Sequence, residues 1–252
     1  MTCAVRARGL SFGYATGTDV LDRLDLDVAH GERVAVLGPN GAGKTTLMLH
    51  LNGLLRGSGE LEVAGLPVRR DTLAELRARV GLVFQDPDDQ LFMTTVAEDV
   101  AFGPSNLGLA DIAERTRAAL AAVRMEAAAP RAPHQLSTGE RRRVAIAGVL
   151  AMEPELLVLD EPSANLDPRA RRELLDVLAA LDRTLLVVTH DLPFAAELCE
   201  RAVILSGGRV VADGSCAELL ADADLLARHD LELPAGFDPA RVTRRPRPRS
   251  CT

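Results

Sequence analysis

The chain has 252 residues, 47% of them hydrophobic and 26% charged, which is the composition of an ordinary globular protein. No apolar run approaches the ~20 residues of a membrane-spanning helix, and the first residues lack a signal-peptide pattern, so we expect a cytoplasmic protein. The formal net charge of −7 disfavours nucleic acid as a partner, because phosphate backbones attract basic surfaces.

Hydrophobic periodicity and turn residues divide the chain into alternating strands and helices. We expect strands at 2–12, 24–29, 33–37, 60–63, 80–84, 156–159, 185–188, 203–205 and 209–212. Helical patterns follow the glycine-rich segment to about residue 54, cover 111–125 and 137–152, and start again after Asp167-Pro168. The segment 86–109 is polar and mixed and indicates no element. This alternation predicts an α/β core with a parallel sheet, followed by a helical appendage at 216–240 and a disordered Arg/Pro-rich tail at 241–252.

A phosphate-binding loop lies between the strand at 33–37 and the helix after it. The pattern G-x-x-x-x-G-K-[ST] is matched by Gly38, Pro39, Asn40, Gly41, Ala42, Gly43, Lys44 and Thr45, with Thr46 next. Glycines let backbone N–H groups turn towards phosphate, and the following helix directs its positive end to the same point. Lys44 is the only lysine among the 29 Lys and Arg residues. We expect Lys44 to reach the β- and γ-phosphates and the Thr45 hydroxyl to bind Mg²⁺.

Three further apolar strands end in polar residues. Asp160 and Glu161 follow 156–159, His190 follows 185–188 after one residue, and Gln85 follows 80–84. The carboxyl ends of parallel strands meet at the edge of the sheet where ligands bind. We therefore expect Asp160, Thr45 and Gln85 to hold Mg²⁺ and Glu161 to activate the attacking water, with His190 and Gln85 assisting. A solvated loop start or a surface histidine would explain either motif taken alone.

The order of these motifs, together with Leu136-Ser-Thr-Gly-Glu140, resembles the ATP-binding cassette (ABC) family over about residues 2–215. The resemblance implies a P-loop NTPase with a mainly parallel sheet, an antiparallel β subdomain and a helical subdomain at about 86–152. It also implies that Ser137 and Gly139 contact the ATP of a second copy, that Asp167 ends the D-loop, and that Tyr14 stacks on adenine. Thr138 and Glu140 depart from the usual Leu-Ser-Gly-Gly-Gln. Helix capping by Ser137 and Glu140, and edge-strand packing of Tyr14, explain these residues as well.

A narrower resemblance connects the chain with the ATPases of energy-coupling-factor (ECF) importers. It rests on the runs 84–92, 98–104 and 142–148, and those at 50–55 and 189–199 look most like the cobalt or nickel branch. The resemblance implies an ATPase at the cytoplasmic face of the membrane, working as a homodimer and contacting a transmembrane scaffold (T) subunit through Asp86–Gln90, beside a substrate-binding (S) subunit. Another transported cargo, such as a vitamin, stays open. A soluble cassette acting on DNA or ribosomes is disfavoured, since neither a coiled coil nor a second phosphate loop is present. A kinase-like enzyme is disfavoured because it would not explain the Leu136–Glu140 signature or His190.

Overall fold

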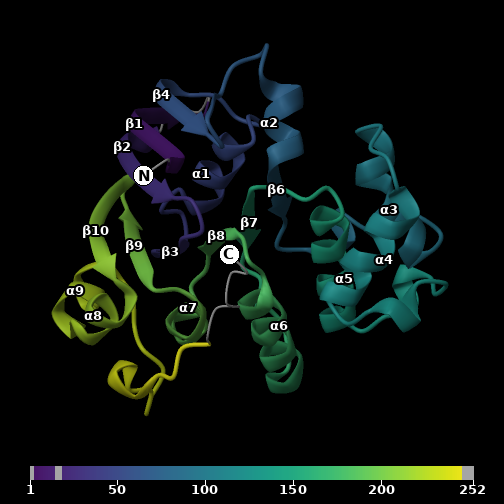
Figure 1. Ribbon diagram of the computed structural model, residues 1–252. Helices are drawn as coiled ribbons and strands as arrows, with labels where there is room; N and C mark the ends of the chain where they lie inside the picture. Colours follow the sequence, from purple (N-terminus) through teal and green to yellow (C-terminus); the bar gives the residue numbers. More distant parts are fainter. Residues whose placement is uncertain (1–2, 15–18, 246–252) are drawn as a thin grey trace.

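The computed structural model describes residues 3–14 and 19–245, whose strands form two sheets (Figure 1). The smaller sheet is antiparallel with the strand order β2-β1-β4-β5. Its strands are β1 (Cys3–Gly13), β2 (Asp19–Ala29), β4 (Ser58–Val63) and β5 (Leu66–Pro67). The long alternating strands β1 and β2 bury one face only, as expected for an antiparallel sheet with an exposed side.

The larger sheet has the order β10-β9-β3-β8-β7-β6 and is parallel except for β10. Its strands are β3 (Arg33–Leu37), β6 (Val80–Val83), β7 (Leu156–Asp160), β8 (Thr184–Val188), β9 (Arg201–Ser206) and β10 (Arg209–Ser215). Four of them, β3, β6, β7 and β8, are buried along their whole length, because elements cover both faces of the sheet.

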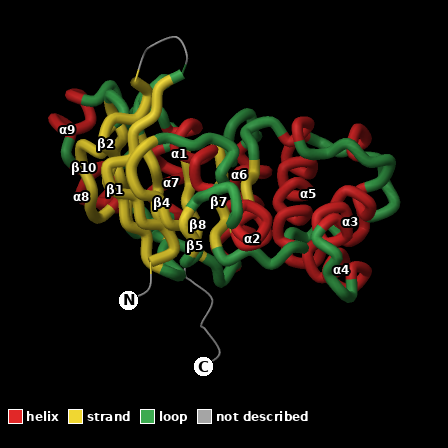
Figure 2. The backbone as a smooth tube through the Cα atoms, turned by 90° about the horizontal axis from the view of Figure 1, so that it is seen from above, coloured by secondary structure: helices red, strands yellow, loops and turns green. Residues whose placement is uncertain are grey.

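Alternate residues of the central strands belong to two separate cores. Val34 and Val36 of β3 face the antiparallel sheet and α1, whereas Ala35 and Leu37 face the helices on the other side. The molecule therefore has three layers, with the parallel sheet in the middle (Figure 2). The helices are α1 (Lys44–Leu51), α2 (Leu73–Arg79), α3 (Val96–Asn106), α4 (Ile112–Ala122), α5 (Thr138–Leu150), α6 (Pro168–Ala180), α7 (Leu192–Leu198), α8 (Cys216–Ala221) and α9 (Ala223–Arg228).

Three helices were not expected from the sequence. Helix α3 lies inside the segment 86–109, and it begins with a capping box between Thr95 and Glu98. Polar residues and Pro104 hide its apolar stripe, although Thr-x-x-Glu is a helix-start pattern. Helices α2 and α7 have seven residues each and are too short to show periodicity. Helix α3, helix α4 and helix α5 pack together as a lobe at one end of the molecule (Figure 1).

The segment after β10 packs back onto the core. Leu220 and Leu226, in α8 and α9, are buried in the core on the helical side. Residues 241–245, where we expected the disordered tail to begin, continue along α6 and α7. Arg245 donates from its backbone N to the Glu197 carbonyl at 3.0 Å and pairs with Asp176 at 2.8 Å. The remainder of the expected tail, 246–252, lies outside the described residues. Within the described part of the chain, no helix is both long and apolar enough to span a bilayer.

Candidate functional site

The carboxyl ends of β3, β8, β7 and β6 are neighbours at one edge of the parallel sheet. Each of these ends carries one of the polar motifs, so the fold gathers residues that are far apart in sequence. A cavity of about 360 Å³ opens at this edge. Its lining contains Tyr14, Val20, Asn40, Gly41, Ala42, Gly43, Lys44, Thr45, Thr46, Gln85, Asp160 and Glu161.

The glycine-rich loop has a backbone that other residues could not adopt. Gly38 has a φ of 149°, and a Cβ added there would lie 2.1 Å from the carbonyl oxygen of Leu205. Gly43, with a φ of 100°, would place a Cβ 2.7 Å from the Val20 carbonyl oxygen. Helix α1 starts directly after Gly43, so its free N–H groups point into the loop. The loop can therefore hold an anion between backbone amides and a helix N-terminus.

The Lys44 ammonium group lies inside this loop. Its Nζ donates to the carbonyl oxygens of Gly38 at 2.7 Å and Pro39 at 2.9 Å, and the residue is 8% exposed. Burial lowers the pKa of Lys44, while the nearby carboxylates of Glu161 and Asp160 act in the opposite direction. An ammonium group has three N–H donors, and the two carbonyls accept from only some of them. Lys44 can therefore turn from these carbonyls to a phosphate.

Asp160 and Glu161 extend from the end of β7 in different directions. Asp160 accepts a hydrogen bond from the Thr45 hydroxyl at 3.0 Å, and burial raises the pKa of its carboxyl despite that bond. The backbone of Glu161 has a left-handed conformation, with a φ of 44°, and its N–H donates to the Val188 carbonyl at 2.8 Å. A non-glycine residue in this region is uncommon and costs conformational free energy. The turn directs the Glu161 side chain towards the end of β8.

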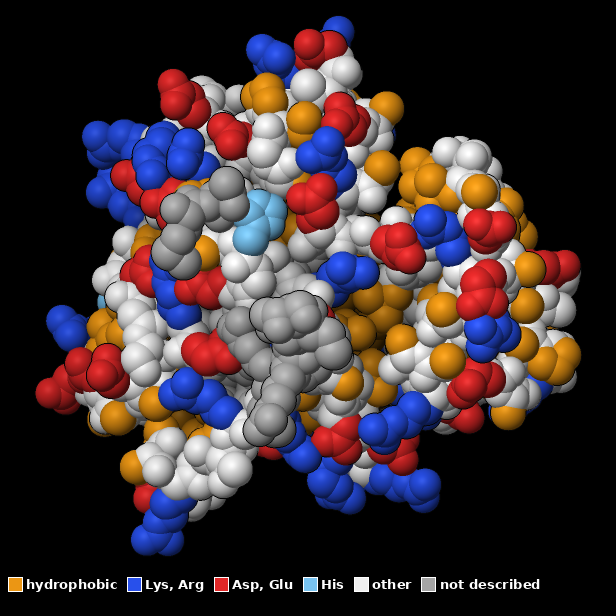
Figure 3. All heavy atoms as spheres, viewed as in Figure 1, with side chains coloured by type: hydrophobic (Ala, Val, Ile, Leu, Met, Phe, Trp, Pro, Cys, Tyr) orange, Lys and Arg blue, Asp and Glu red, His pale blue; other side chains and the backbone are white. Residues whose placement is uncertain are grey.

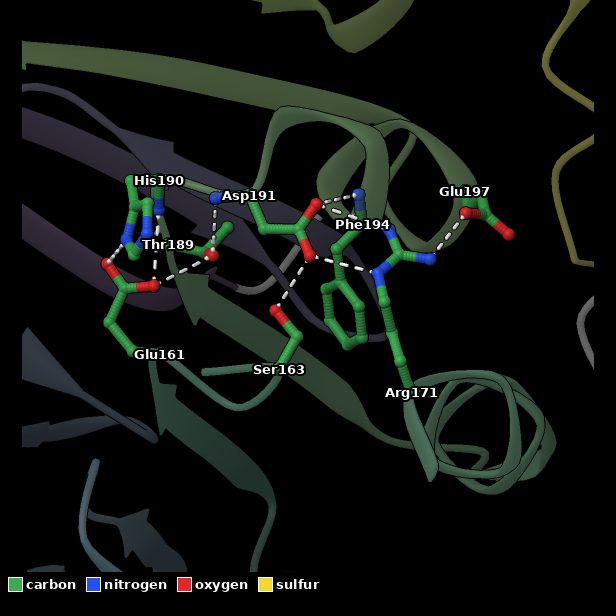
Figure 4. A network of polar contacts seen from close by, with 8 residues as sticks. All are labelled: Glu161, Ser163, Arg171, Thr189, His190, Asp191, Phe194 and Glu197. Atoms are coloured by element: carbon green, nitrogen blue, oxygen red, sulfur yellow. Dashed lines mark hydrogen bonds and ion pairs between the residues drawn. The ribbon is translucent and has the colours of Figure 1, made fainter. Parts of the chain in front are cut away.

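The Glu161 carboxylate is held by the residues that follow β8 (Figure 4). Its Oε2 accepts from the Thr189 hydroxyl at 3.0 Å and from the His190 backbone N at 3.2 Å. Its Oε1 lies 2.8 Å from Nδ1 of His190. The His190 ring is largely exposed, whereas Glu161 is 8% exposed. The carboxylate thus has fixed orientation and one side towards the cavity.

Gln85 also lines a second cavity of about 550 Å³, between the sheet edge and α5. The loop that carries Gln85 is held by a buried arginine and by the side chain of Gln90. Arg142 of α5, 1% exposed, donates from Nη1 to the Phe84 carbonyl at 3.0 Å. The Gln90 side chain turns inward, accepting from the Phe84 backbone N at 2.8 Å and donating to the Leu82 carbonyl at 3.1 Å. A run of three arginines at 141–143 gave no signal that its middle member is buried.

Six predicted site residues do not line either cavity. Gly38, Pro39 and His190 lie next to residues that do, whereas Ser137, Gly139 and Asp167 lie at the starts of α5 and α6. Ser137 caps α5, and Asp167 caps α6 by accepting from the backbone N of Arg169 and Ala170. Gly139 lets the two helix starts approach, since a Cβ there would lie 2.7 Å from the Ala170 Cβ. Tyr14 stands at the rim of the first cavity, 45% exposed, with its hydroxyl 3.4 Å from that of Thr46. Its ring meets Phe12 edge-on.

No group of three or more His, Cys, Asp or Glu side chains in the described ranges is arranged to hold a metal ion. Any cation in the cavity would therefore need ligands beyond carboxylates and imidazoles. The oxygen atoms at hand are those of Thr45, Asp160 and Gln85. They are hard donors of the kind that suits Mg²⁺ when phosphate and water complete its shell.

Comparison with known proteins gives consistent matches. Residues 21–164 match the family model described as ABC transporter. A protein of Streptomyces coelicolor, named as a candidate ABC transporter ATP-binding protein, is 62% identical over 93% of this chain and 91% of its own length. The energy-coupling factor transporter ATP-binding protein EcfA of Methanothermobacter thermautotrophicus is 47% identical over 93% of this chain and 78% of its own length.

Solved structures agree with these sequence matches. CbiO1 from Clostridium perfringens, described as part of the ABC transporter complex cbiONQ, has a TM-score of 0.82 and 36% identity, over 93% of this chain and 97% of its own. The ATP-binding cassette MJ0796, in a dimeric post-hydrolysis state bound to ADP and Pi, has a TM-score of 0.76 and 27% identity. It covers 84% of this chain and 98% of its own.

Proposed function

The chain belongs to the ABC transporter family of ATP-hydrolysing cassettes, and from this premise we propose that it is the ATPase subunit of an ECF-type importer for cobalt or nickel ions. The observation that carries the ATPase part is the single cavity in which Lys44, Thr45, Asp160 and Glu161 meet. The importer part is supported by relatives named EcfA at 44–47% identity and by the CbiO1 structure.

We propose that the loop at residues 38–46 encloses the triphosphate of ATP, with Lys44 moving from the loop carbonyls to the β- and γ-phosphates. Tyr14 at the rim is placed to stack on the adenine ring. Mg²⁺ fits the oxygen donors present: Thr45 and Asp160 already lie 3.0 Å apart, and Gln85 lines the same cavity. When bound, Mg²⁺ would neutralise phosphate charge. The raised pKa of Asp160 reflects a buried carboxyl that a cation would favour in its ionised form.

Glu161 is the proposed general base, because its carboxylate borders the cavity and is oriented by Thr189 and His190. It would orient the attacking water and accept its proton as the water bonds to the γ-phosphorus and the bond to ADP breaks. His190, whose largely exposed ring contacts Glu161, would assist at the γ-phosphate. Positioning and charge neutralisation supply most of the rate in phosphoryl transfer.

A second copy would complete each site. In the proposed homodimer, the α5 start with Ser137 and Gly139 faces the γ-phosphate held by the partner, and the segment ending at Asp167 lies along the interface. Ser137 and Gly139 are absent from both cavities of their own chain, which is consistent with service in trans. The dimeric MJ0796 structure supports this arrangement. Closure on ATP and opening after hydrolysis would form the power stroke.

The proposed partners in the membrane are the T and S subunits, with this chain at the cytoplasmic face and residues 86–90 contacting the T subunit. In this segment Asp88 and Asp89 are exposed, whereas Gln90 braces the end of β6. A pair of exposed aromatic rings, Phe92 and Phe102, lies beside it with centroids 4.9 Å apart. Hydrophobic side chains are visible over the same lobe in Figure 3. Gln90 would therefore act by relaying movement of the loop to Gln85 rather than by surface contact.

The test begins with Mg²⁺-dependent ATP hydrolysis by the purified chain. Glu161→Gln should retain ATP binding, lower turnover and accumulate a dimer on size exclusion with ATP. A Glu161→Gln variant that hydrolyses ATP at the wild-type rate and stays monomeric would refute the assignment. Tagged chain purified from detergent-solubilised membranes should carry small hydrophobic subunits. Cobalt uptake by that complex supports the metal cargo, uptake of a vitamin replaces it, and absence of membrane partners favours a non-transport cassette.

A further inference from the structure

A network of buried and half-buried polar groups lies next to Glu161 and connects three elements (Figure 4). At its centre is Asp191, which caps α7 by accepting from the Phe194 backbone N at 2.8 Å. The same carboxylate accepts from the Ser163 hydroxyl at 2.9 Å and from Arg171 of α6 at 3.0 and 3.2 Å. Each carboxylate oxygen therefore has two donors, and the arginine is bidentate.

Arg171 is fixed on several sides. Its Nη1 contacts Glu197 of α7 at 2.9 Å, and its guanidinium lies 5.4 Å from the centre of the Phe194 ring. Burial disfavours ionisation of Asp191, but the hydrogen bonds from Arg171 and Phe194 outweigh it and lower the pKa of the carboxyl. Asp191 is consequently ionised at neutral pH. Removing Arg171 would leave this half-buried carboxylate without its cationic partner, whereas removing Asp191 would leave Arg171 paired with Glu197 alone.

The Thr189 hydroxyl connects Asp191 to Glu161 through two hydrogen bonds. The backbone N of Asp191 donates to the Thr189 hydroxyl at 3.0 Å, and that hydroxyl lies 3.0 Å from Oε2 of Glu161. A threonine hydroxyl has one hydrogen, and because its oxygen accepts from Asp191, the hydrogen is free to go to Glu161. Thr189 is fully buried, so water does not compete. Aligned hydrogen bonds of this kind polarise one another.

Ser163 closes the network on the other side. It lies two residues after Glu161 in the turn that leads to Asp167, where Ala164 N donates to the Glu161 carbonyl at 3.0 Å. The residues after β7 and those after β8 are thus joined twice: once through Glu161 itself and once through Ser163 and Asp191.

We propose that Asp191, held by Arg171, is a positioning residue that fixes Glu161 and His190 for hydrolysis and ties them to the segment 163–167. This inference rests on the proposed function, because it assigns a role towards the base of that reaction. Asp191 and Arg171 line neither cavity, so their proposed role is indirect. The expected consequence of loosening the pair is a loss of turnover with ATP binding preserved.

The test uses the full-length chain and measures kcat, KM for ATP and Tm. Asp191→Asn keeps the shape but presents an amide NH₂ to Ser163 or Arg171, and we expect kcat to fall about 10²-fold, the effect of a ~1 Å misplacement. KM should stay within about threefold, because Lys44 and the loop do not contact Asp191. Glu197→Gln, which removes the charge of the outer Arg171 partner and leaves Asp191 unchanged, is the matched control and should stay close to the wild-type kcat.

A double variant separates positioning from simple stabilisation. Arg171→Met with Asp191→Leu replaces the half-buried pair by apolar side chains, so that Asp191 is not left as a lone charge as it is in Arg171→Met. We expect Tm to recover relative to Arg171→Met while kcat stays low, because Ser163 and the Phe194 N lose their acceptor. Recovery of kcat together with Tm, or an Asp191→Asn variant with unchanged kcat, would overturn the proposal. A wild-type chain without Mg²⁺-dependent turnover would instead refute the proposed function.

Discussion

Glu140 stands where the family signature usually has glutamine. We expect Glu140→Gln to lower the stability of the folded chain and to favour closure of the proposed dimer. Its Oε2 accepts from the Ser137 hydroxyl and from the Ser137 backbone N, both at 2.8 Å. The contacts with Ser137 lower the pKa of Glu140, so the carboxylate is ionised at neutral pH. In the proposed dimer, the Ser137 hydroxyl that should bind the partner's γ-phosphate already has an acidic acceptor, and a negative charge lies beside it.

Glu140→Gln keeps an acceptor for Ser137 but removes the charge. The helix start loses a charge-assisted capping interaction of about 0.5–1 kcal/mol, which lowers Tm by roughly 1–4 °C in a chain of this size. Repulsion between the carboxylate and the phosphate is reduced by Arg131, 3.7 Å away, and by solvent. We therefore estimate a gain of about 1 kcal/mol in closure, or roughly fivefold less ATP at the midpoint.

The assay is sedimentation velocity across an ATP titration, with Glu161→Gln as background so that hydrolysis does not reopen the dimer. Glu114→Gln, which removes an exposed carboxylate paired with Arg117 on α4, is the control for a general change in net charge. An unchanged or higher ATP midpoint in Glu140→Gln/Glu161→Gln than in Glu161→Gln alone would refute the reasoning.

Two further predictions concern packing and thiol chemistry. Gly139→Ala places a Cβ 2.7 Å from that of Ala170, so α5 and α6 must separate. We expect the free energy of unfolding to fall by about 1–3 kcal/mol, seen as a lower midpoint in urea unfolding. An unchanged midpoint would show that the two helix starts are not in contact. Burial raises the pKa of the Cys216 thiol to about 11. At pH 8, iodoacetamide should therefore modify Cys3 long before Cys216, as read by peptide mass spectrometry. Equal labelling of the two cysteines in the folded protein would contradict the packing of α8.

The predictable parts of the fold are those with strong local signals. The apolar runs at 33–37, 156–159 and 185–188 lie in the parallel sheet as expected, and the fold class is confirmed. Helix α3 was missed because its start is marked only by Thr95 and Glu98, and its stability comes from packing against α4 and α5. Helix α7 was missed because seven residues give too little periodicity.

The candidate site follows the same logic. The phosphate-loop pattern identifies Lys44, and the acidic residues after an apolar strand identify Asp160 and Glu161. Both patterns can be recognised from the sequence alone. The hydrogen bonds that orient Glu161, and the placement of Arg142 and Arg171, depend on residues up to 58 positions apart. Nothing local distinguishes Arg142 and Arg171 from the other arginines of an arginine-rich chain.

In the proposed function, the Lys44 loop holds the triphosphate of ATP with Mg²⁺ beside Asp160 and Glu161. Isothermal titration of Mg²⁺ and ATP into wild type and Lys44→Ala, with folding verified by circular dichroism, tests it most directly. Loss of charge-assisted hydrogen bonds worth about 1.5–3 kcal/mol predicts binding roughly 10- to 150-fold weaker in the variant. Equal affinity in the two proteins, or tight binding of ATP by wild type without Mg²⁺ and no effect of adding it, would contradict the account.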